Sequence, residues 1–157
     1  MSQTRIRFCL YNQQKWIFKP FLFLLPTKLV LPTEKYLNTL VVSITNMKED
    51  LISNIKSFKN SAELVYSTKD YTSAAILYFK CLFVVLDLII LQKNGKTPKD
   101  HTERFKILKE DFSELYSFLD KYYSVYRQTY SLTIDKTACN EVKENVERII
   151  KEFKIDV

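Results

Sequence analysis

Glycine is almost absent from this chain of 157 residues, which contains one glycine and four prolines. All-β folds need turn residues at about every 8–12 positions, so this composition argues against them. The same scarcity excludes glycine-rich phosphate loops, both the P-loop and the dinucleotide-binding fingerprint. With 46% hydrophobic and 27% charged residues, the chain has the composition of a packed globular protein. These features predict one all-α domain with a short appendage.

Residues that bind metals or carry redox chemistry are scarce as well. The single histidine excludes a histidine-rich metal site. The three cysteines, Cys9, Cys81 and Cys139, lie far apart, and no pair has the spacing of a zinc or redox motif. We therefore expect no cofactor, and small packing roles for the cysteines. An odd number of widely spaced cysteines predicts reduced thiols and a cytoplasmic location.

The net charge of +6 is concentrated at the N-terminus. Residues 1–46 hold six basic residues and one acidic residue, whereas residues 47–157 hold 18 basic and 17 acidic residues. One local concentration follows in the body, where Lys93 to Lys109 include six basic and two acidic residues. This cluster either contacts phosphate or is the solvated face of a loop and a helix start.

The first 32 residues show no clean helical period. Three prolines and Lys28 interrupt their apolar stretch, which is too short for a membrane span and lacks a following cleavage signal. Phe18, Phe21, Phe23 and Leu25 alternate, as in a short extended segment. We expect residues 1–32 to be a loosely attached extension. The predicted division places a basic extension and helix start in 1–46 and a helical bundle in 47–157.

A long amphipathic helix is predicted after Thr33, which can cap its start. Apolar residues recur there at steps of three and four up to Val65, and the helix should end near Thr68. Asp70 can cap the next helix, residues 71–92, which is apolar on nearly every face.

This apolar segment fits either a membrane span or the central helix of a bundle. Lys80 and Asp87 lie inside it, and each would cost about 2.5–3.5 kcal/mol at a bilayer centre. The central helix is therefore favoured, and no membrane association is expected. Their spacing of seven places Lys80 and Asp87 on one face, as a structural or interface ion pair or as part of a groove.

Three further helices complete the prediction. A loop around Gly95 leads to a short helix over about residues 100–108, and a longer helix covers about residues 111–130. Thr133 or Asp135 can cap the last helix, which runs to about Phe153. Short connections make neighbouring helices antiparallel, so the expected architecture is an antiparallel up-down bundle of four to five helices.

Four segments follow one another in the chain: DLISNIKSFKNSAELVYSTKDYTSAAILYFKCLF, NGKTPKDHTERFKIL, LDKYYSVYRQTY and TIDKTACNEVKENVERIIKEF. Together and in this order they resemble the HEPN family (higher eukaryotes and prokaryotes nucleotide-binding). The resemblance covers about Met47 to Phe153. It implies a HEPN-like bundle that is usually dimeric. Several members of that family are RNases, often toxins paired with a small nucleotidyltransferase.

The RNase site of that family is an arginine followed four to six residues later by a histidine. Arg127 matches the arginine, but Ser131, Leu132 and Thr133 occupy the positions where histidine would stand. The only histidine, His101, lies upstream in another helix. Because RNA cleavage by general acid–base chemistry needs a group that titrates near neutrality, we expect no ordinary RNase activity and assign no catalytic residue.

The candidate ligand-binding residues are aromatic and basic. Arg127 can grip phosphate while Tyr123, Tyr126 and Tyr130 stack bases, although bundle packing explains the same pattern. His101 with Arg104 forms a second candidate site, and the alternative is that His101 is a helix cap or a surface residue. The main hypothesis is a non-catalytic HEPN-like module that binds nucleotide, RNA or a nucleotidyltransferase partner, as a homodimer in a toxin–antitoxin-like context. The alternatives are a degenerate endoribonuclease with another site and a structural helical adaptor.

Overall fold

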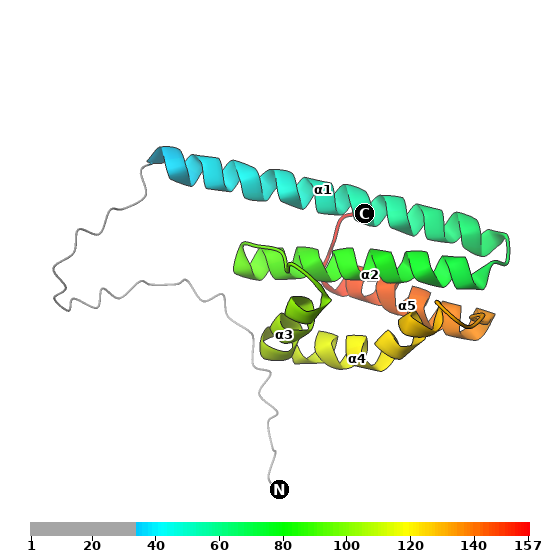
Figure 1. Cartoon of the computed structure of the whole chain (residues 1–157). Helices are drawn as coiled ribbons and strands as arrows, with labels where there is room; N and C mark the ends of the chain where they lie inside the picture. Colours follow the sequence, from blue (N-terminus) through cyan, green and yellow to red (C-terminus); the bar gives the residue numbers. More distant parts are fainter. Residues whose placement is uncertain (1–33) are drawn as a thin grey trace, which may run out of the picture. The chain divides into compact units, whose positions relative to one another are not determined.

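The computed structural model describes residues 34–157, which form a bundle of five helices with no strand in that range (Figure 1). The predictions for the apolar N-terminal stretch and for the Thr33 cap lie outside these residues. The all-α prediction is confirmed for the described chain. The helices, in chain order, are α1 (Glu34–Ser67), α2 (Tyr71–Asn94), α3 (His101–Asp111), α4 (Ser113–Gln128) and α5 (Lys136–Glu152).

Helices α1 and α2 form an antiparallel hairpin closed by a short turn (Figure 1). Lys69 adopts a left-handed conformation with φ of 69°, which ends α1. The Asp70 carboxylate then accepts a hydrogen bond of 3.0 Å from the backbone N–H of Ser73, as expected for the cap of α2. Helix α1 runs without a break through residues 46 and 47, where the sequence had placed the start of the bundle.

Helix α2 is the central element of the bundle, as predicted. Its buried residues lie on several sides because α1, α3, α4 and α5 all contact it, and they include Ala74, Tyr78, Phe79, Leu82, Val85, Leu86, Leu88 and Ile90. In the described range, α2 alone is long and apolar enough to cross a membrane. It is largely buried by the other helices, which favours the core-helix interpretation. The only glycine of the chain, Gly95, ends α2 with φ of 71°.

Helices α3 and α5 begin at aspartate caps. The side chain of Asp100 accepts a hydrogen bond of 2.8 Å from the N–H of Glu103, and Asp135 accepts one of 2.8 Å from Ala138. Asp135, rather than Thr133, is therefore the cap of the last helix. Helix α4 follows α3 after the single residue Phe112, so these two helices meet at a sharp bend.

A group of polar side chains connects α1, α2 and α5. Glu63 on α1 accepts hydrogen bonds from Tyr78 at 2.8 Å and from Lys143 at 2.6 Å. Burial raises the pKa of Glu63, but the bonds from Lys143 and Tyr78 outweigh it, so the pKa lies below its ordinary value. The carboxylate therefore stays charged and paired at neutral pH.

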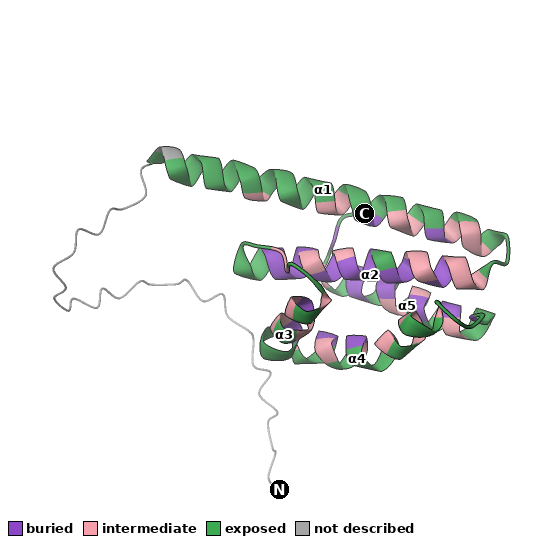
Figure 2. Cartoon of the chain, viewed as in Figure 1, coloured by how far each residue is buried: buried purple, intermediate pink, exposed green. Residues whose placement is uncertain are grey.

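The amphipathic stripe of α1 is packed over only part of its length. Ile55 and Ala62 are fully buried against the bundle. Towards the N-terminal end, Leu37, Leu40 and Val41 are exposed, although they continue the same stripe (Figure 2). The sequence pattern identified the helix and its apolar side, but not the point at which its intramolecular partner ends.

Candidate functional site

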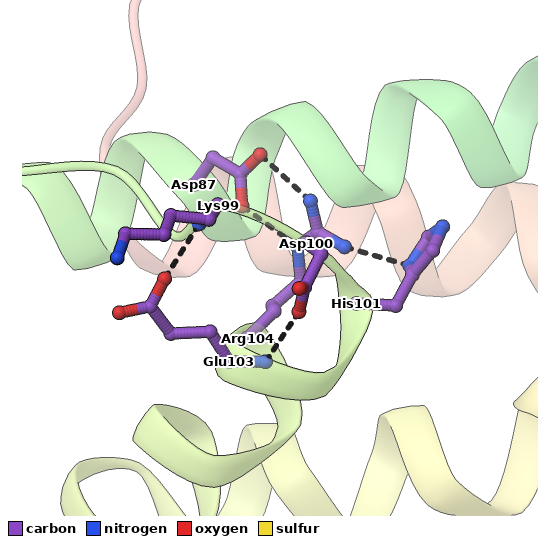
Figure 3. A network of polar contacts seen from close by, with 6 residues as sticks. All are labelled: Asp87, Lys99, Asp100, His101, Glu103 and Arg104. Atoms are coloured by element: carbon purple, nitrogen blue, oxygen red, sulfur yellow. Dashed lines mark hydrogen bonds and ion pairs between the residues drawn. The ribbon is translucent and has the colours of Figure 1, made fainter.

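The centre of the candidate site is a buried ion pair between α2 and α3. The Arg104 side chain donates from Nε to Oδ1 of Asp87 at 2.7 Å and from Nη2 to Oδ2 at 2.9 Å (Figure 3). Arg104 is only 8% exposed, and its guanidinium also lies 5.1 Å from the ring centre of Phe83. The bidentate geometry fixes the position of α3 against α2. Of the two interpretations of Lys80 and Asp87, the ion pair is wrong, because the carboxylate of Asp87 binds Arg104 instead.

His101 is held by the same arginine. The Nη1 atom of Arg104 lies 2.7 Å from Nδ1 of His101 (Figure 3). Arginine has no acceptor and stays protonated, so Nδ1 must accept this hydrogen bond. The imidazole is consequently neutral, with its proton on Nε2. In this tautomer neither ring nitrogen can take a proton from a substrate while the contact with Arg104 persists.

Two neighbouring carboxylates complete the geometry of the α3 start. Asp100 caps the helix, and Glu103 accepts a hydrogen bond of 2.7 Å from the backbone N–H of Lys99 (Figure 3). Together these bonds form a reciprocal cap that fixes the first turn of α3. His101 and Arg104 therefore project from a helix end with a defined orientation.

The pKa of His101 should make stability depend on pH. Burial lowers this pKa below 6.5, and the positive charge of Arg104 lowers it further, while Asp87 and Asp100 oppose the shift. Since the unfolded chain binds the proton more readily, stability from this group is complete above about pH 6.5 and is lost as pH falls towards the folded-state pKa. We expect His101→Gln, which keeps an acceptor without titrating, to remove this slope. Urea unfolding of both proteins between pH 7.5 and pH 5 tests it, and parallel pH profiles would contradict it.

Aromatic rings from α2 and α4 surround the imidazole. Phe83 lies 4.7 Å from His101 between ring centres, and Tyr123 and Tyr126 lie at 6.0 Å and 6.3 Å. The hydroxyls of Tyr126 and Tyr130 are 2.9 Å apart, and this hydrogen bond, together with burial, raises the pKa of Tyr126 to about 12. Tyr130 is itself 77% exposed. The structure thus joins His101 and Arg104 to two tyrosines of the other candidate group, Tyr123 and Tyr126.

Arg127 is not part of this cluster. It is exposed on α4, and its side chain makes no hydrogen bond, ion pair or ring contact with any residue in the range 34–157. Tyr123 and Tyr126 lie on the helix side that packs against the bundle, whereas Arg127 is exposed on the adjoining side. Tyr130 follows the helix and is exposed as well. Arg127 therefore offers a separate surface cation and does not line the groove described below.

The basic cluster between Lys93 and Lys109 is less available than its sequence indicates. Lys93 pairs with Asp111 at 3.1 Å, and Arg104 pairs with Asp87. Lys96, Lys99, Lys106 and Lys109 remain exposed without an ion pair among the described residues. Two of the six cations are thus neutralised, which weakens the interpretation of this segment as one phosphate-binding surface.

An open groove lies over the ion pair. Its volume is about 310 Å³, and its lining residues are Phe58, Lys80, Phe83, Val84, Asp87, His101, Arg104 and Tyr126. Lys80 is exposed, and its Nζ lies 5.7 Å from the ring centre of Phe58, with no carboxylate partner in the described part of the chain. The groove therefore combines aromatic walls, the only histidine and one lysine whose charge is not neutralised.

The two cysteines in the described range, Cys81 and Cys139, are both buried. Burial raises the pKa of Cys81 to about 12 and that of Cys139 to about 11, so both thiols stay protonated. Within residues 34–157 no group of three metal-ligating side chains comes together. No known family, curated protein or solved structure matches this chain.

The sequence contained a signal for part of the groove. Lys80 and Asp87 are charged residues seven positions apart in an otherwise apolar helix, and this spacing indicated a shared face. It could not show that Arg104 pairs with Asp87, because that contact depends on how the loop after Gly95 returns α3 to α2. Phe58 and Phe83 carried no signal, since aromatic residues on an apolar helix face are ordinary core residues.

Proposed function

We propose that this protein is a non-catalytic, HEPN-like binding module whose groove takes a nucleotide or an unpaired base of RNA with its phosphate. The observation that carries the proposal is the meeting of Lys80, His101 and the Phe83–Tyr126 ring pair in one open groove. Aromatic faces stack bases without regard to sequence, and a lysine supplies a point charge for phosphate. The four-segment resemblance points to the same class of ligand.

The state of the polar groups supports binding over turnover. His101 offers only an Nε2–H donor. Arg104 donates from Nε and Nη2 to Asp87 and from Nη1 to His101, so three of its five N–H groups are already used. RNA cleavage needs a base that removes a proton from the ribose 2′-hydroxyl, and a protonated Nε2 cannot do so. Arg104 and His101 act here as positioning and hydrogen-bonding groups, and Lys80 is the free cation of the groove.

Lys80→Ala should weaken binding of a nucleotide such as AMP, or of a short single-stranded RNA, about tenfold at low salt. Binding by wild type should also weaken as salt rises, because cation–phosphate contacts release counterions. Titration calorimetry or fluorescence anisotropy measures both effects. Lys106→Ala is the matched control, because Lys106 is an exposed lysine in the basic cluster that does not line the groove. Equal losses of binding affinity in the two variants would indicate that the ligand binds at the basic cluster and not in the groove.

An RNA-cleavage assay tests the absence of catalysis. We expect no cleavage above background by wild type or by Arg127→Ala, because no histidine follows Arg127 and His101 has no free base. Cleavage that Arg127→Ala abolishes would contradict the proposal and favour a degenerate endoribonuclease. A folded wild-type protein that binds neither AMP nor RNA would favour a protein-binding adaptor, for which a nucleotidyltransferase is the partner to test.

A further inference from the structure

The N-terminal part of α1 extends past the rest of the bundle. Helix α1 has 34 residues and α2 has 24, so the first turns of α1 have no part of α2 opposite them. Figure 1 shows this end of α1 running past the end of α2, and Figure 2 shows most of it exposed, with Ile44 half-buried. The difference in length corresponds to residues 34–43, and we refer to these together with the adjoining residues 44–48 as the overhang.

The overhang is uncharged and apolar on one side. Residues 36–47, YLNTLVVSITNM, contain no charged side chain. The apolar residues that share one side by helical spacing continue the stripe of Ile55 and Ala62, and they are Leu37, Leu40, Val41, Ile44 and Met47. Leu40 is 58% exposed and Val41 is 61% exposed. The stripe that packs α1 on α2 therefore continues outwards without an intramolecular partner in the described range.

A segment of this composition forms only a weakly stable helix when water surrounds it. Val41, Val42 and Ile44 are β-branched, and residues 36–47 offer no charged pairs at spacings of three or four. Because propensity contributes little here, packing of the apolar side must supply most of the stability of the helix. An exposed apolar patch on one continuous side is the mark of an interaction surface.

We propose that the overhang pairs with the overhang of a second copy of this chain, as an antiparallel two-helix contact. The spacing of Leu37, Ile44 and Leu51, with Leu40 and Met47 between them, is the heptad pattern of paired helices. In the antiparallel register, Leu37 faces Met47 of the second copy and Leu40 faces Ile44. The contact is isologous, so each layer occurs twice.

The charges at the two ends of the overhang select this arrangement. Glu34 and Lys48 are exposed and flank the apolar stripe on the same edge, 14 residues apart. The antiparallel register brings Glu34 next to Lys48 of the second copy, twice by symmetry. A parallel pair would leave Glu34 and Lys48 of the second copy 14 residues apart along the helix axis, so neither ion pair could form. The uncharged centre between them carries no repulsion against its own copy.

Substitutions in the overhang test the surface. Light scattering of the full chain at micromolar concentration should give twice the chain mass of 18.7 kDa. Leu40→Glu or Val41→Glu should weaken the dimer more than about 100-fold, because each places two carboxylates in the apolar contact. Val42→Glu is the matched control, since Val42 is 57% exposed on the opposite side of the same helix and should leave the dimer intact. None of the three residues is buried, so the fold should survive, which circular dichroism checks.

Charge reversal tests the register. Glu34→Lys and Lys48→Glu should each weaken dimerisation about tenfold at low salt, and the double variant should restore it. A monomeric wild-type chain would overturn the proposal, and protection of the overhang from hydrogen exchange in that monomer would assign the surface to an intramolecular contact. A dimer that withstands Leu40→Glu, one that Val42→Glu disrupts equally, or a failure of the double reversal to restore it would also overturn the proposal.

Discussion

Asp87→Ala should lower the free energy of unfolding by about 3–5 kcal/mol, one of the largest effects of any single substitution in this bundle. The carboxylate is the ion-pair partner of Arg104, with N–O distances of 2.7 Å and 2.9 Å. Without it, the buried guanidinium would keep its charge and lose its partner, because arginine cannot lose a proton in a protein. Urea unfolding at pH 7 measures the loss.

A double substitution separates the cost of an unpaired charge from the value of the pair. Arg104→Met alone should also destabilise, since it leaves Asp87 without its donor in a mostly buried position. Asp87→Leu combined with Arg104→Met removes both charges and fills the space with apolar groups, so it should cost much less than the sum of the single losses. Strict additivity of the two single losses would contradict a direct coupling between Asp87 and Arg104.

The Arg104→Met variant also tests the effect of Arg104 on the titration of His101. Arg104→Met removes the cation that lies 2.7 Å from Nδ1, so the pKa of His101 should rise towards its ordinary value. Proton NMR of the single histidine follows this titration without interference from other imidazoles. A merely structural role for Arg104 would destabilise the bundle without changing this titration in the folded state.

The helices of the described chain were largely predictable because their signals are local. Asp70 and Asp135 were among the predicted caps, and each caps a helix; Asp100, predicted as the first residue of its helix, is a cap as well. The central position of α2 followed from an apolar surface on every side, which only burial by several neighbours can satisfy. Both signals depend on a few adjacent residues, so no long-range contact had to be known.

The candidate site was less predictable because its contacts join residues far apart in the sequence. His101 and Arg104 come from α3, Asp87 from α2 and Tyr126 from α4. Nothing in the spacing of these residues shows that Arg104 would donate hydrogen bonds to both the carboxylate of Asp87 and the imidazole of His101. Arg127 was the leading candidate because tyrosines stand beside it in the sequence. In the bundle Tyr123 and Tyr126 pack against the core, whereas Arg127 and Tyr130 are exposed.

Phe79→Ala is the second substitution with a large expected effect, a loss of about 3–5 kcal/mol in the free energy of unfolding. Phe79 is fully buried on α2, and its ring lies 5.3 Å from that of Tyr126 and 6.3 Å from that of Phe83, measured between ring centres. Removing the ring leaves a cavity in the centre of the bundle, which the surrounding helices can fill only in part. Leu64→Ala on α1 is the control, because Leu64 is 70% exposed and its truncation should change stability by less than about 0.5 kcal/mol.

The effect of Phe79→Ala should extend to the groove. Phe83 and Tyr126 line the groove on one side and contact Phe79 on the other, so the cavity removes the support behind both rings. Phe79→Leu keeps most of the volume and should cost less stability while binding the nucleotide probe more tightly than Phe79→Ala does. If Phe79→Ala, measured below its unfolding transition, bound AMP or RNA as wild type does, the groove over Phe83 and Tyr126 would not be the binding site, and the exposed side of α4 around Arg127 would be the next surface to test.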